Sequence, residues 1–254
     1  MTLDSEKFES LCKEYNSDWR VQSHIGTYNE KRLHLILKRM VTDRFESYEV
    51  KIGSYVADVL EDGHITEIQT GGLYPLRDKL GYYLSSTDYR ITVIHPVIAS
   101  KRILRVDKES GEVLRCRRSP RRIKSGEIFE EIYRIGEYVR DDRLEIIILY
   151  LSADEHRYSD EAVRYRKTGK YDSELFPQSI LKYESFCGAE DYRYLLSDCP
   201  ELFTAKEYGK LKGMSGRPLY STLNLLCQLG LLSRRKKNSR SYEYTLLTPH
   251  TEHA

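Results

Sequence analysis

The sequence predicts an α/β fold in which a mixed β-sheet is flanked by helices and followed by a small helical unit with a β-hairpin. Between residues 27 and 100, helical and strand patterns alternate, as in an α/β layer. The most apolar run, residues 144–151, is short and rich in β-branched side chains, which predicts a buried strand. Residues 202–247 have the pattern of helix, turn, helix and hairpin.

Composition narrows the class of protein. Charged residues make up 31% of the chain and hydrophobic residues 40%, which is typical of a soluble globular protein rather than a disordered or fibrous one. No apolar stretch approaches the roughly 18 residues of a membrane-spanning helix. The first ten residues, MTLDSEKFES, lack the apolar core of a signal peptide. We therefore expect a cytoplasmic protein that does not associate with membranes.

Two helices are expected before the first strand. Residues 1–20 carry a weak helical pattern, and Asn29 is placed to cap a helix from Glu30 to about Met40. Apolar side chains recur in this second helix at three- and four-residue steps. Glu30 lies in its first turn, where the helix dipole favours a carboxylate. It serves either that dipole alone or a functional site beside the helix.

Residues 55–70, YVADVLEDGHITEIQT, predict a β-hairpin. The Asp-Gly pair at 62–63 is a strong signal for a two-residue type I′ turn. A turn there places Asp58 directly opposite Glu67, and opposed like charges destabilise a sheet. The two carboxylates therefore call for a cation, and Gln69 adds a neutral oxygen on the same face. A hard divalent metal such as Mg²⁺ suits these oxygen ligands.

A helix and further strands follow the hairpin. Proline fits the first turn of a helix over residues 75–84, which carries Arg77 and Lys79 at the end near the hairpin. Residues 89–97 predict a buried strand that ends at its proline. Residues 103–114 predict another hairpin around a polar turn.

Six basic residues gather between positions 115 and 124. Such a run is either a solvated loop or an arm that binds phosphates. The arm would use four arginines, namely Arg117, Arg118, Arg121 and Arg122. The net charge of +2 over the whole chain is too small to indicate nucleic-acid binding. Only local clusters of basic residues such as this one can indicate it.

The remaining patterns suggest a division into domains. A helix is expected over residues 127–138, before the buried strand. Residues 152–174 are strongly charged and predict an exposed connection or a surface hairpin, and helical packing is expected near 175–196. We therefore expect an α/β domain at 1–165, a helical connection at 166–198 and a C-terminal domain at 199–254.

The C-terminal stretch resembles a winged helix-turn-helix domain. Thr204 begins a capping box, a turn at 213–216 precedes a second helix that ends at Gly230, and a hairpin with a basic tip follows. Such domains place the second helix in the DNA major groove and the hairpin on the backbone. The resemblance implies DNA contacts from the second helix (Arg217, Tyr220, Ser221, Asn224, Gln228) and from the hairpin (Arg234, Arg235, Lys236, Lys237, Arg240). The alternative is a domain that contacts protein.

The hairpin and its surroundings resemble the PD-(D/E)XK nuclease superfamily. That family places an acidic residue on a helix, an aspartate on one strand and (D/E)-x-K on the next, followed by a helix and a strand. Asp58 and the run Glu67-Ile68-Gln69 fit this order, and Glu30 fits the helical acid. The chain is also similar to uncharacterised prokaryotic proteins with an IEIQT-like strand. The resemblance implies a restriction-endonuclease-like fold over residues 27–100.

The family's chemistry is metal-assisted hydrolysis of a phosphodiester. The resemblance implies that Asp58, Glu67 and Glu30 hold Mg²⁺ or Mn²⁺ and that Gln69 positions the attacking water. Gln69 replaces the family's lysine and supplies neither charge nor proton. Lys79, or less favourably Arg77, would provide the missing cation from the next helix.

Three functions are therefore in view. The first is a metal-dependent DNA endonuclease that binds DNA through a winged helix. The second is a pseudo-nuclease or a regulatory or targeting subunit that binds DNA without cutting it. The third is an assembly subunit in which both domains contact protein. The partners expected are DNA and either a second copy of the chain or another protein of a multi-subunit system.

Overall fold

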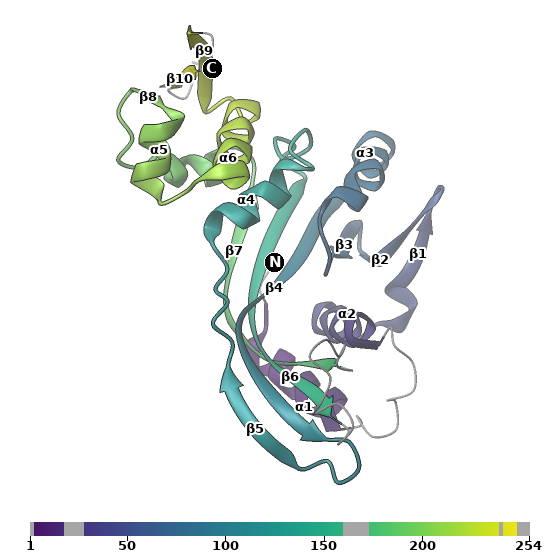
Figure 1. The fold of residues 1–254 in the computed structure, drawn as a ribbon. Coiled ribbons are helices and arrows are strands. Elements are labelled where there is room, and N and C mark those ends of the chain that lie inside the picture. The colour runs from purple at the N-terminus through teal and green to yellow at the C-terminus, as the bar shows by residue number, and fades with distance from the viewer. Residues whose placement is uncertain (1–2, 18–27, 160–172, 239–240, 248–254) are drawn as a thin grey trace.

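A computed structural model describes residues 3–17, 28–159, 173–238 and 241–247, and is a mixed α/β structure (Figure 1). Seven strands of the described chain form one sheet in the order β1-β2-β3-β4-β6-β7, with β5 paired to β4. The strands are β1 (Tyr48–Ile52), β2 (Tyr55–Glu61), β3 (His64–Ile68), β4 (Arg90–Asp107), β5 (Val113–Arg118), β6 (Leu144–Ser159) and β7 (Ser173–Cys187). The β3–β4 and β4–β6 pairs are parallel and the others antiparallel, so the predicted mixed sheet is confirmed.

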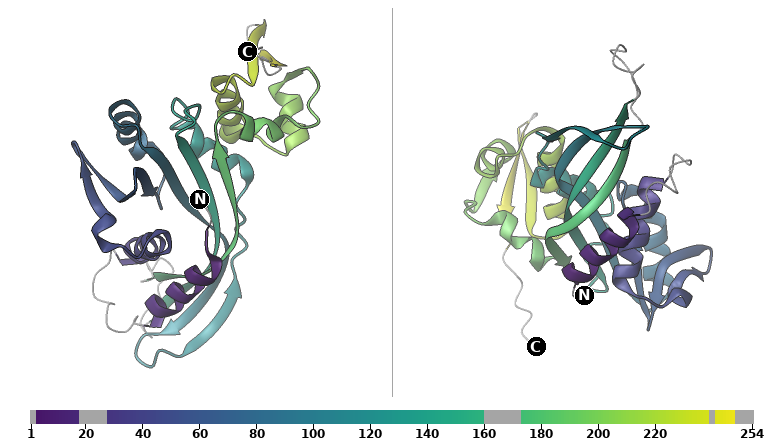
Figure 2. Two further views of the ribbon diagram at one scale, coloured as in Figure 1. Left: turned by 180° about the vertical axis from the view of Figure 1, so that it is seen from behind. Right: turned by 90° about the horizontal axis from the view of Figure 1, so that it is seen from below.

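Helices cover both faces of the sheet (Figure 2). They are α1 (Ser5–Ser17), α2 (Tyr28–Val41), the short η1 (Phe45–Ser47) and η2 (Tyr74–Leu76), α3 (Arg77–Ser86) and α4 (Ser125–Tyr133). The apolar side chains of α1 and α2 pack with alternate strand residues such as Ile94 and Ile147. Those of α3 and α4 pack with the intervening residues such as Val93 and Ile146. This division follows from the two-residue alternation of side chains along a strand.

The predicted hairpin is present, and its turn has the expected conformation. Asp62 and Gly63 have φ values of 49° and 74°. A type I′ turn requires positive φ at both central residues, which glycine and aspartate tolerate better than most. The turn joins β2 to β3 and sets the pairs Glu61–His64 and Val59–Thr66.

The prediction that Pro96 ends its strand is wrong, because β4 continues to Asp107. Ile94 is the last β4 residue paired with β3, and its carbonyl accepts a hydrogen bond from Gln69 on that side. Backbone groups two residues apart point the same way, so Pro96 turns its nitrogen toward an edge that β3 has already left. Proline is tolerated where no ladder donor is needed. The strand therefore extends into a long bent arm with β5, β6 and β7 (Figure 1).

The predicted helical connection after the sheet is wrong for most of its length, because helix is present in the described part of that stretch only over Glu190–Leu196. Residues 173–187 form β7, which pairs along β6 and closes the sheet. The charged stretch before it was predicted to be exposed, but its described part contains the end of β6, where Asp154 and Glu155 are buried. Residues 160–172 lie outside the described chain. The backbone pairing along β6, rather than an alternation of buried and exposed side chains, makes residues 173–187 a strand. The sheet unit therefore extends to Cys187 rather than to residue 165.

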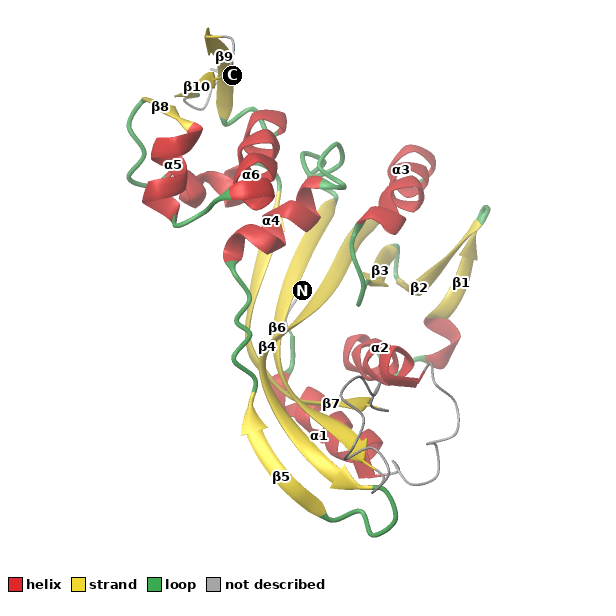
Figure 3. Cartoon of the chain, viewed as in Figure 1, coloured by secondary structure: helices red, strands yellow, loops and turns green. Residues whose placement is uncertain are grey.

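The C-terminal unit contains the predicted order of helix, turn, helix and hairpin (Figure 3). It comprises η4 (Glu190–Leu196), β8 (Leu202–Thr204), α5 (Ala205–Lys212), α6 (Gly216–Gln228), β9 (Leu232–Asn238) and β10 (Ser241–Leu246), with β10 between β8 and β9. The capping box is confirmed, since the Thr204 hydroxyl accepts from the Glu207 amide. Buried leucines of α6 join the same core as α4 and the sheet. The unit is thus docked on the sheet rather than tethered to it.

Over the described residues, no helix is long and apolar enough to cross a membrane.

Candidate functional site

Asp58 lies where β2 and β3 separate. The pairs between these strands stop at Val59–Thr66, so the predicted direct pairing of Asp58 with Glu67 is absent. Instead the Asp58 carboxylate accepts a hydrogen bond from the Ile68 amide, with Oδ2 2.8 Å from the nitrogen. The side chain thus replaces the missing ladder bond and keeps the strand ends together.

Two side chains of α2 complete the surroundings of Asp58. His34 Nε2 is 3.1 Å from Asp58 Oδ2, and Lys38 Nζ is 3.6 Å from Oδ1. Lys38 also binds Glu49 on β1. Burial favours the neutral acid, but the hydrogen bond and charge of His34, the Ile68 amide and the charge of Lys38 together hold the pKa of Asp58 below its ordinary value. Asp58 is therefore an ionised carboxylate surrounded by donors.

Glu67 is almost completely buried, with 1% of its surface exposed. Lys79 Nζ, from the helix after β3, is 2.6 Å from Glu67 Oε2, and the Tyr83 hydroxyl donates to Oε1 over 3.3 Å. Burial raises the pKa of Glu67 to about 7; Lys79 opposes that rise, and the negative charge of Asp58 adds to it. The two acids of the hairpin are therefore electrically coupled although they are not paired.

Gln69 turns away from both acids. Its amide Nε2 donates to the Gly72 carbonyl over 2.8 Å, within the loop that leads to η2. Its backbone carbonyl accepts from His95 Nδ1 at 2.7 Å. Gln69 therefore orders the loop after β3, and its predicted place beside the two carboxylates is not observed.

The site thus differs from the predicted set. Lys79, which was expected to supply the missing cation, contacts Glu67, whereas Arg77 pairs with Glu137 on the surface, 2.5 Å away. Glu30 falls in α2, but its side chain is outside the described part of the chain. His34 and Lys38 were not predicted. The available signal was their four-residue spacing, which puts two polar side chains on one face of a mainly apolar helix.

The described residues around Asp58 and Glu67 offer few ligands to a metal ion. In the part of the chain that the structure describes, no three side chains of His, Cys, Asp or Glu come close enough to share a metal ion. Asp58 and Glu67 provide two carboxylates, each now held by a lysine. A hard cation that takes most of its ligands from water and phosphate needs only one or two protein carboxylates.

The basic run, which begins within β5 and ends before α4, is divided between several surfaces. Arg117 lines a hollow of about 210 Å³ on the β5 arm. Arg118, the next residue, is opposite Arg102, which makes a double hydrogen bond to Asp154. Arg121 Nη2 lies 3.9 Å from Glu127 of α4, and Arg122 is exposed. The run is therefore partly strand, and its arginines do not form one patch.

The α6 residues that were predicted to contact DNA have different surroundings in the structure. Arg217, Ser221 and Gln228 line a cavity of about 540 Å³ against α4 and η2, and Arg217 pairs with Glu130 at 3.5 Å. Ser221 is buried there, whereas Arg217 and Gln228 remain exposed to solvent. Tyr220 is 55% exposed, and Asn224 accepts from Arg234 of β9 over 3.1 Å.

The basic hairpin is partly neutralised. Glu243 on β10 lies 3.1 Å from Arg235 and 2.8 Å from Lys237. Arg234 stacks over Tyr242, and Lys236 is exposed. Arg240 lies outside the described residues.

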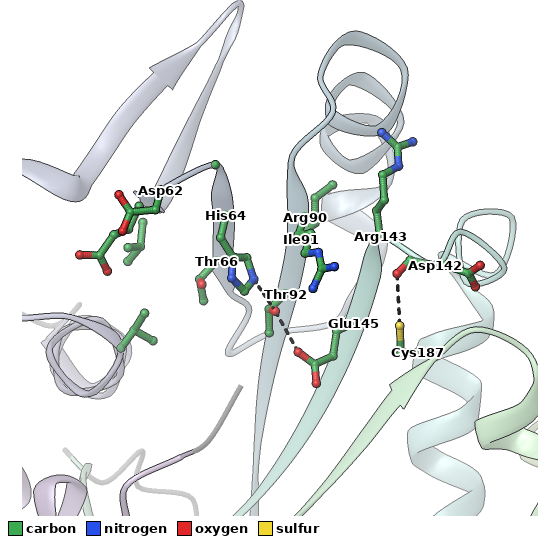
Figure 4. A pocket seen from close by; sticks show the side chains of 14 residues that line it. Asp62, His64, Thr66, Arg90, Ile91, Thr92, Asp142, Arg143, Glu145 and Cys187 are labelled. Carbon is green, nitrogen blue, oxygen red and sulfur yellow. Dashed lines mark hydrogen bonds between the residues drawn. The ribbon is translucent and has the colours of Figure 1, made fainter.

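A second cavity, of about 690 Å³, lies at the turn end of β3 and β4 (Figure 4). Across its floor, Thr92 donates to Glu145 Oε2 over 3.1 Å, so His64 Nε2, 2.8 Å away, donates to the Thr92 hydroxyl. Burial lowers the pKa of His64, which favours this neutral ring. The chain of polar contacts joins three strands and is separate from Asp58 and Glu67.

Comparisons with known proteins establish a family but no activity. A family model described as "Domain of unknown function (DUF8091)" matches residues 31–187, more than half of the sequence, and the chain belongs to that family. The match runs from α2 to the end of β7 and includes His34, Asp58, Glu67 and Lys79. An uncharacterized protein of Treponema pallidum (strain Nichols) is 28% identical over 225 residues, covering 87% of this chain and 86% of that protein. No solved structure matches the chain.

Proposed function

We propose that this member of the DUF8091 family is a metal-dependent nuclease that hydrolyses phosphodiester bonds of DNA on a restriction-endonuclease-like sheet. The observation that carries the proposal is the contact between Lys79 Nζ and the buried Glu67, 2.6 Å apart, beside the ionised Asp58. Two carboxylates whose pKa values are displaced in opposite directions lie with a lysine where two strands separate, and such a cluster is typical of functional sites. Lys79 would take the role of the family's motif lysine, whose position in this sequence is occupied by Gln69.

The donor chemistry of the cluster fits Mg²⁺ or Mn²⁺. Asp58 and Glu67 would hold the ion through carboxylate oxygens, with Glu30 of α2 as a further ligand. When bound, the ion lowers the pKa of a coordinated water and polarises the phosphoryl group. In the structure, Lys38 and Lys79 balance the negative charges of the two carboxylates. A bound ion would balance these charges in place of the lysines.

The chain's own side chains have separable roles. Asp58 remains ionised near neutral pH because donors surround it. Glu67, with its pKa raised to about 7, changes charge near neutrality and holds Lys79 in place. Lys79 would offset negative charge that develops on the phosphate. Tyr83 fixes the second oxygen of Glu67 from the same helix.

The C-terminal unit would act as a winged helix that binds DNA. Its support is the order of β8, α5, α6, β9 and β10, with Tyr220 exposed on α6 and Lys236 exposed on β9. Because α4 covers one side of α6, contact would come from the Tyr220–Asn224 side and the hairpin. Phosphate contacts of this kind position a protein on DNA without reading its sequence.

The test is cleavage of supercoiled plasmid, linear duplex and single-stranded DNA with Mg²⁺ or Mn²⁺. We expect nicking or cutting that EDTA abolishes, with Asp58→Asn, Glu67→Gln and Lys79→Met each lowering the rate at least a hundredfold. Lys51→Met is the matched control, because Lys51 is exposed on β1. Full activity in Lys79→Met would contradict the proposed role of this lysine, and full activity in both acid variants would contradict the site.

One observation favours a second function, DNA binding without cleavage. The Gln69 amide is bonded to the Gly72 carbonyl, and both acids already have cationic partners. A pseudo-nuclease would retain this closed arrangement. Tight DNA binding by the wild type, with no cleavage of any of the three substrates in either metal, would select this function.

A further inference from the structure

A cavity of about 600 Å³ lies between the loop that follows β3, the middle of β4 and the start of α4. Volumes of about 300–1,000 Å³ are typical of pockets that hold small molecules. The described residues that line this cavity include neither Asp58 nor Glu67. It is therefore distinct from the candidate site described above.

His95 of β4 brings an unused hydrogen-bond acceptor to this cavity. Its side chain lines the cavity and is otherwise buried, with 7% of the residue exposed. The Gln69 carbonyl, 2.7 Å from His95 Nδ1, can only accept, so Nδ1 carries the proton and donates. Burial also lowers the pKa of His95, which favours the neutral ring. Nε2 then carries a lone pair and has no hydrogen-bond partner among the described residues, so it calls for a donor from a ligand.

The other walls of the cavity suit a flat and partly apolar group. Apolar side chains of β4, of α4 and of the segment before α4 line it, namely Pro96, Val97, Ile98, Ile123 and Ile128. Gly71 and Gly72 add a stretch of wall without side chains. A Cβ on Gly72 would lie 3.0 Å from Glu131 Oε2, so a larger residue there would press against α4. The loop therefore closes one side of the cavity without filling it.

The charged side chains around the cavity differ in how firmly they are held. Glu131 accepts hydrogen bonds on both of its carboxylate oxygens, and Lys101 Nζ lies 2.5 Å from Glu155. The Arg121 side chain is 82% exposed, and its Nη2 is 3.9 Å from Glu127 Oε2, beyond hydrogen-bond distance. Arg121 is therefore the cation at this cavity that can turn most readily to an anion.

The cavity adjoins the candidate site along the sheet. Glu67 is paired with Val93, which lies two residues before His95 on β4. Side chains two residues apart on a strand point to the same face and are separated by about 6.6–6.8 Å along it. A DNA strand held at Glu67 would therefore pass close to the cavity.

We propose that this cavity binds one nucleotide, with its base against His95 and its phosphate on Arg121. A base has two apolar faces and carries N–H groups at its edge, which Nε2 can accept from. A guanidinium group presents donors in a fork that fits phosphate oxygens. The nucleotide is either free in solution or part of a DNA strand, since proteins can take a single base out of the stack and place it in a pocket.

The inference rests on the proposed nuclease for DNA as the source of the nucleotide, but it uses other residues. His95 and Arg121 would hold a nucleotide beside the Asp58–Glu67 cluster and would not participate in hydrolysis. Binding can be measured in EDTA, where a metal-dependent reaction cannot proceed. Failure of this proposal and failure of the proposed nuclease are therefore distinguishable.

The first experiment is calorimetric titration of the full chain in EDTA with each of the four deoxynucleoside monophosphates and with deoxyribose 5-phosphate, which has no base. The second is fluorescence anisotropy of labelled single-stranded and duplex DNA under the same conditions. We expect a monophosphate to bind about tenfold or more tightly than deoxyribose 5-phosphate if the nucleotide is free. We expect only DNA to bind if the base comes from a strand.

Two variants test the residues in whichever of these ligands binds. His95→Asn keeps a donor for the Gln69 carbonyl and removes the Nε2 acceptor, so we expect binding to weaken about fivefold to tenfold. Arg121→Gln should weaken it about tenfold or more, since hydrogen bonds to charged groups are stronger. The matched control is Lys124→Gln, which removes one positive charge from an exposed residue of the same segment outside the cavity lining. It should change affinity less than twofold.

Melting temperatures separate a binding effect from a folding effect. If His95→Asn melts far below the wild type, Arg121→Gln decides, because its side chain is exposed. Weaker binding in the folded variants than in Lys124→Gln supports the proposal even if the wild type cuts no DNA. Unchanged binding in Arg121→Gln and folded His95→Asn, or no binding of any ligand, would overturn it even if Asp58→Asn abolished cleavage. Equal affinity for deoxyribose 5-phosphate and the monophosphates would also overturn it, in favour of a site for small anions.

Discussion

At the scale of single residues, the environment of Glu67 is the main chemical feature of the chain. The carboxyl group is buried between Lys79 and Tyr83, and the nearby charge of Asp58 makes its ionisation harder. Asp58, on the neighbouring strand, is instead surrounded by donors and ionises easily. Two carboxyl groups of one hairpin therefore have pKa values displaced in opposite directions, which is how acid and base roles are separated in many active sites.

The raised pKa of Glu67 predicts a pH-dependent stability. Its pKa of about 7 in the folded protein exceeds the ordinary 4.5, so between these values the folded state binds more protons than the unfolded state. The contribution of Glu67 to stability is therefore complete below pH 4.5 and is lost as pH rises toward 7, by roughly 3 kcal/mol at most. We expect Glu67→Gln to remove this slope in denaturant titrations from pH 4.5 to 8. Glu137→Gln, on the surface beside Arg77, should retain it; an identical slope in Glu67→Gln would show that Glu67 does not titrate in this range.

At the scale of elements, helix caps and turns explain where the C-terminal helices begin. Helix α5 starts at Thr204, whose side chain accepts from the Glu207 amide while Glu207 reaches back to the Thr204 backbone. Helix α6 starts at Ser215, whose side chain makes no capping bond. The two caps have similar hydroxyl side chains but different bonding, which makes them a natural pair for comparison.

This difference predicts unequal effects of the same type of substitution. Thr204→Ala removes a capping bond and should lower the free energy of unfolding by about 1 kcal/mol. Ser215→Ala removes no such bond and should change it by a few tenths of a kcal/mol. Chemical denaturation of both variants measures the difference. Equal losses would mean that the Thr204 capping bond contributes nothing to stability.

At the scale of the whole molecule, the C-terminal unit and the sheet share one core. Leucines of α6 pack with α4 and with strand residues, and α4 approaches α6 so closely that a Cβ on Gly126 would lie 3.0 Å from Pro218. The same contact hides one side of α6. Docking therefore both stabilises the C-terminal unit and decides which of its side chains remain accessible.

A shared core predicts that damage to α6 is felt by the entire chain. Leu223 is completely buried, so Leu223→Ala should lower stability by about 2–5 kcal/mol. We expect calorimetry to show one transition at a lower temperature, since the two units lose a common core. Leu211→Ala is the control, because Leu211 is 47% exposed on α5. A separate low-temperature transition for the C-terminal unit would show that it unfolds independently.

The sequence predicted the local features correctly, because each of them depends on residues that are adjacent in the chain. The Asp62-Gly63 turn, the Thr204 capping box and the apolar, β-branched strand that begins at Leu144 each depend on the conformational preference of a few adjacent residues. The position of Lys79 could also be predicted, since it lies on the helix directly after the strand of Glu67.

Only the tertiary structure decided what surrounds those local features. His34 and Lys38 meet Asp58 because α2 packs beside β3, the neighbour of the strand that carries Asp58. Strands β2 and β3 separate before they reach the predicted Asp58–Glu67 pair. Pro96 stayed within its strand because β3 had already ended beside it. Arg105 of β4 is a neighbour of Arg115 of β5 and of Arg157 of β6 only through the register of these three strands. Such contacts depend on the pairing of distant segments, which a sequence pattern of short range does not encode.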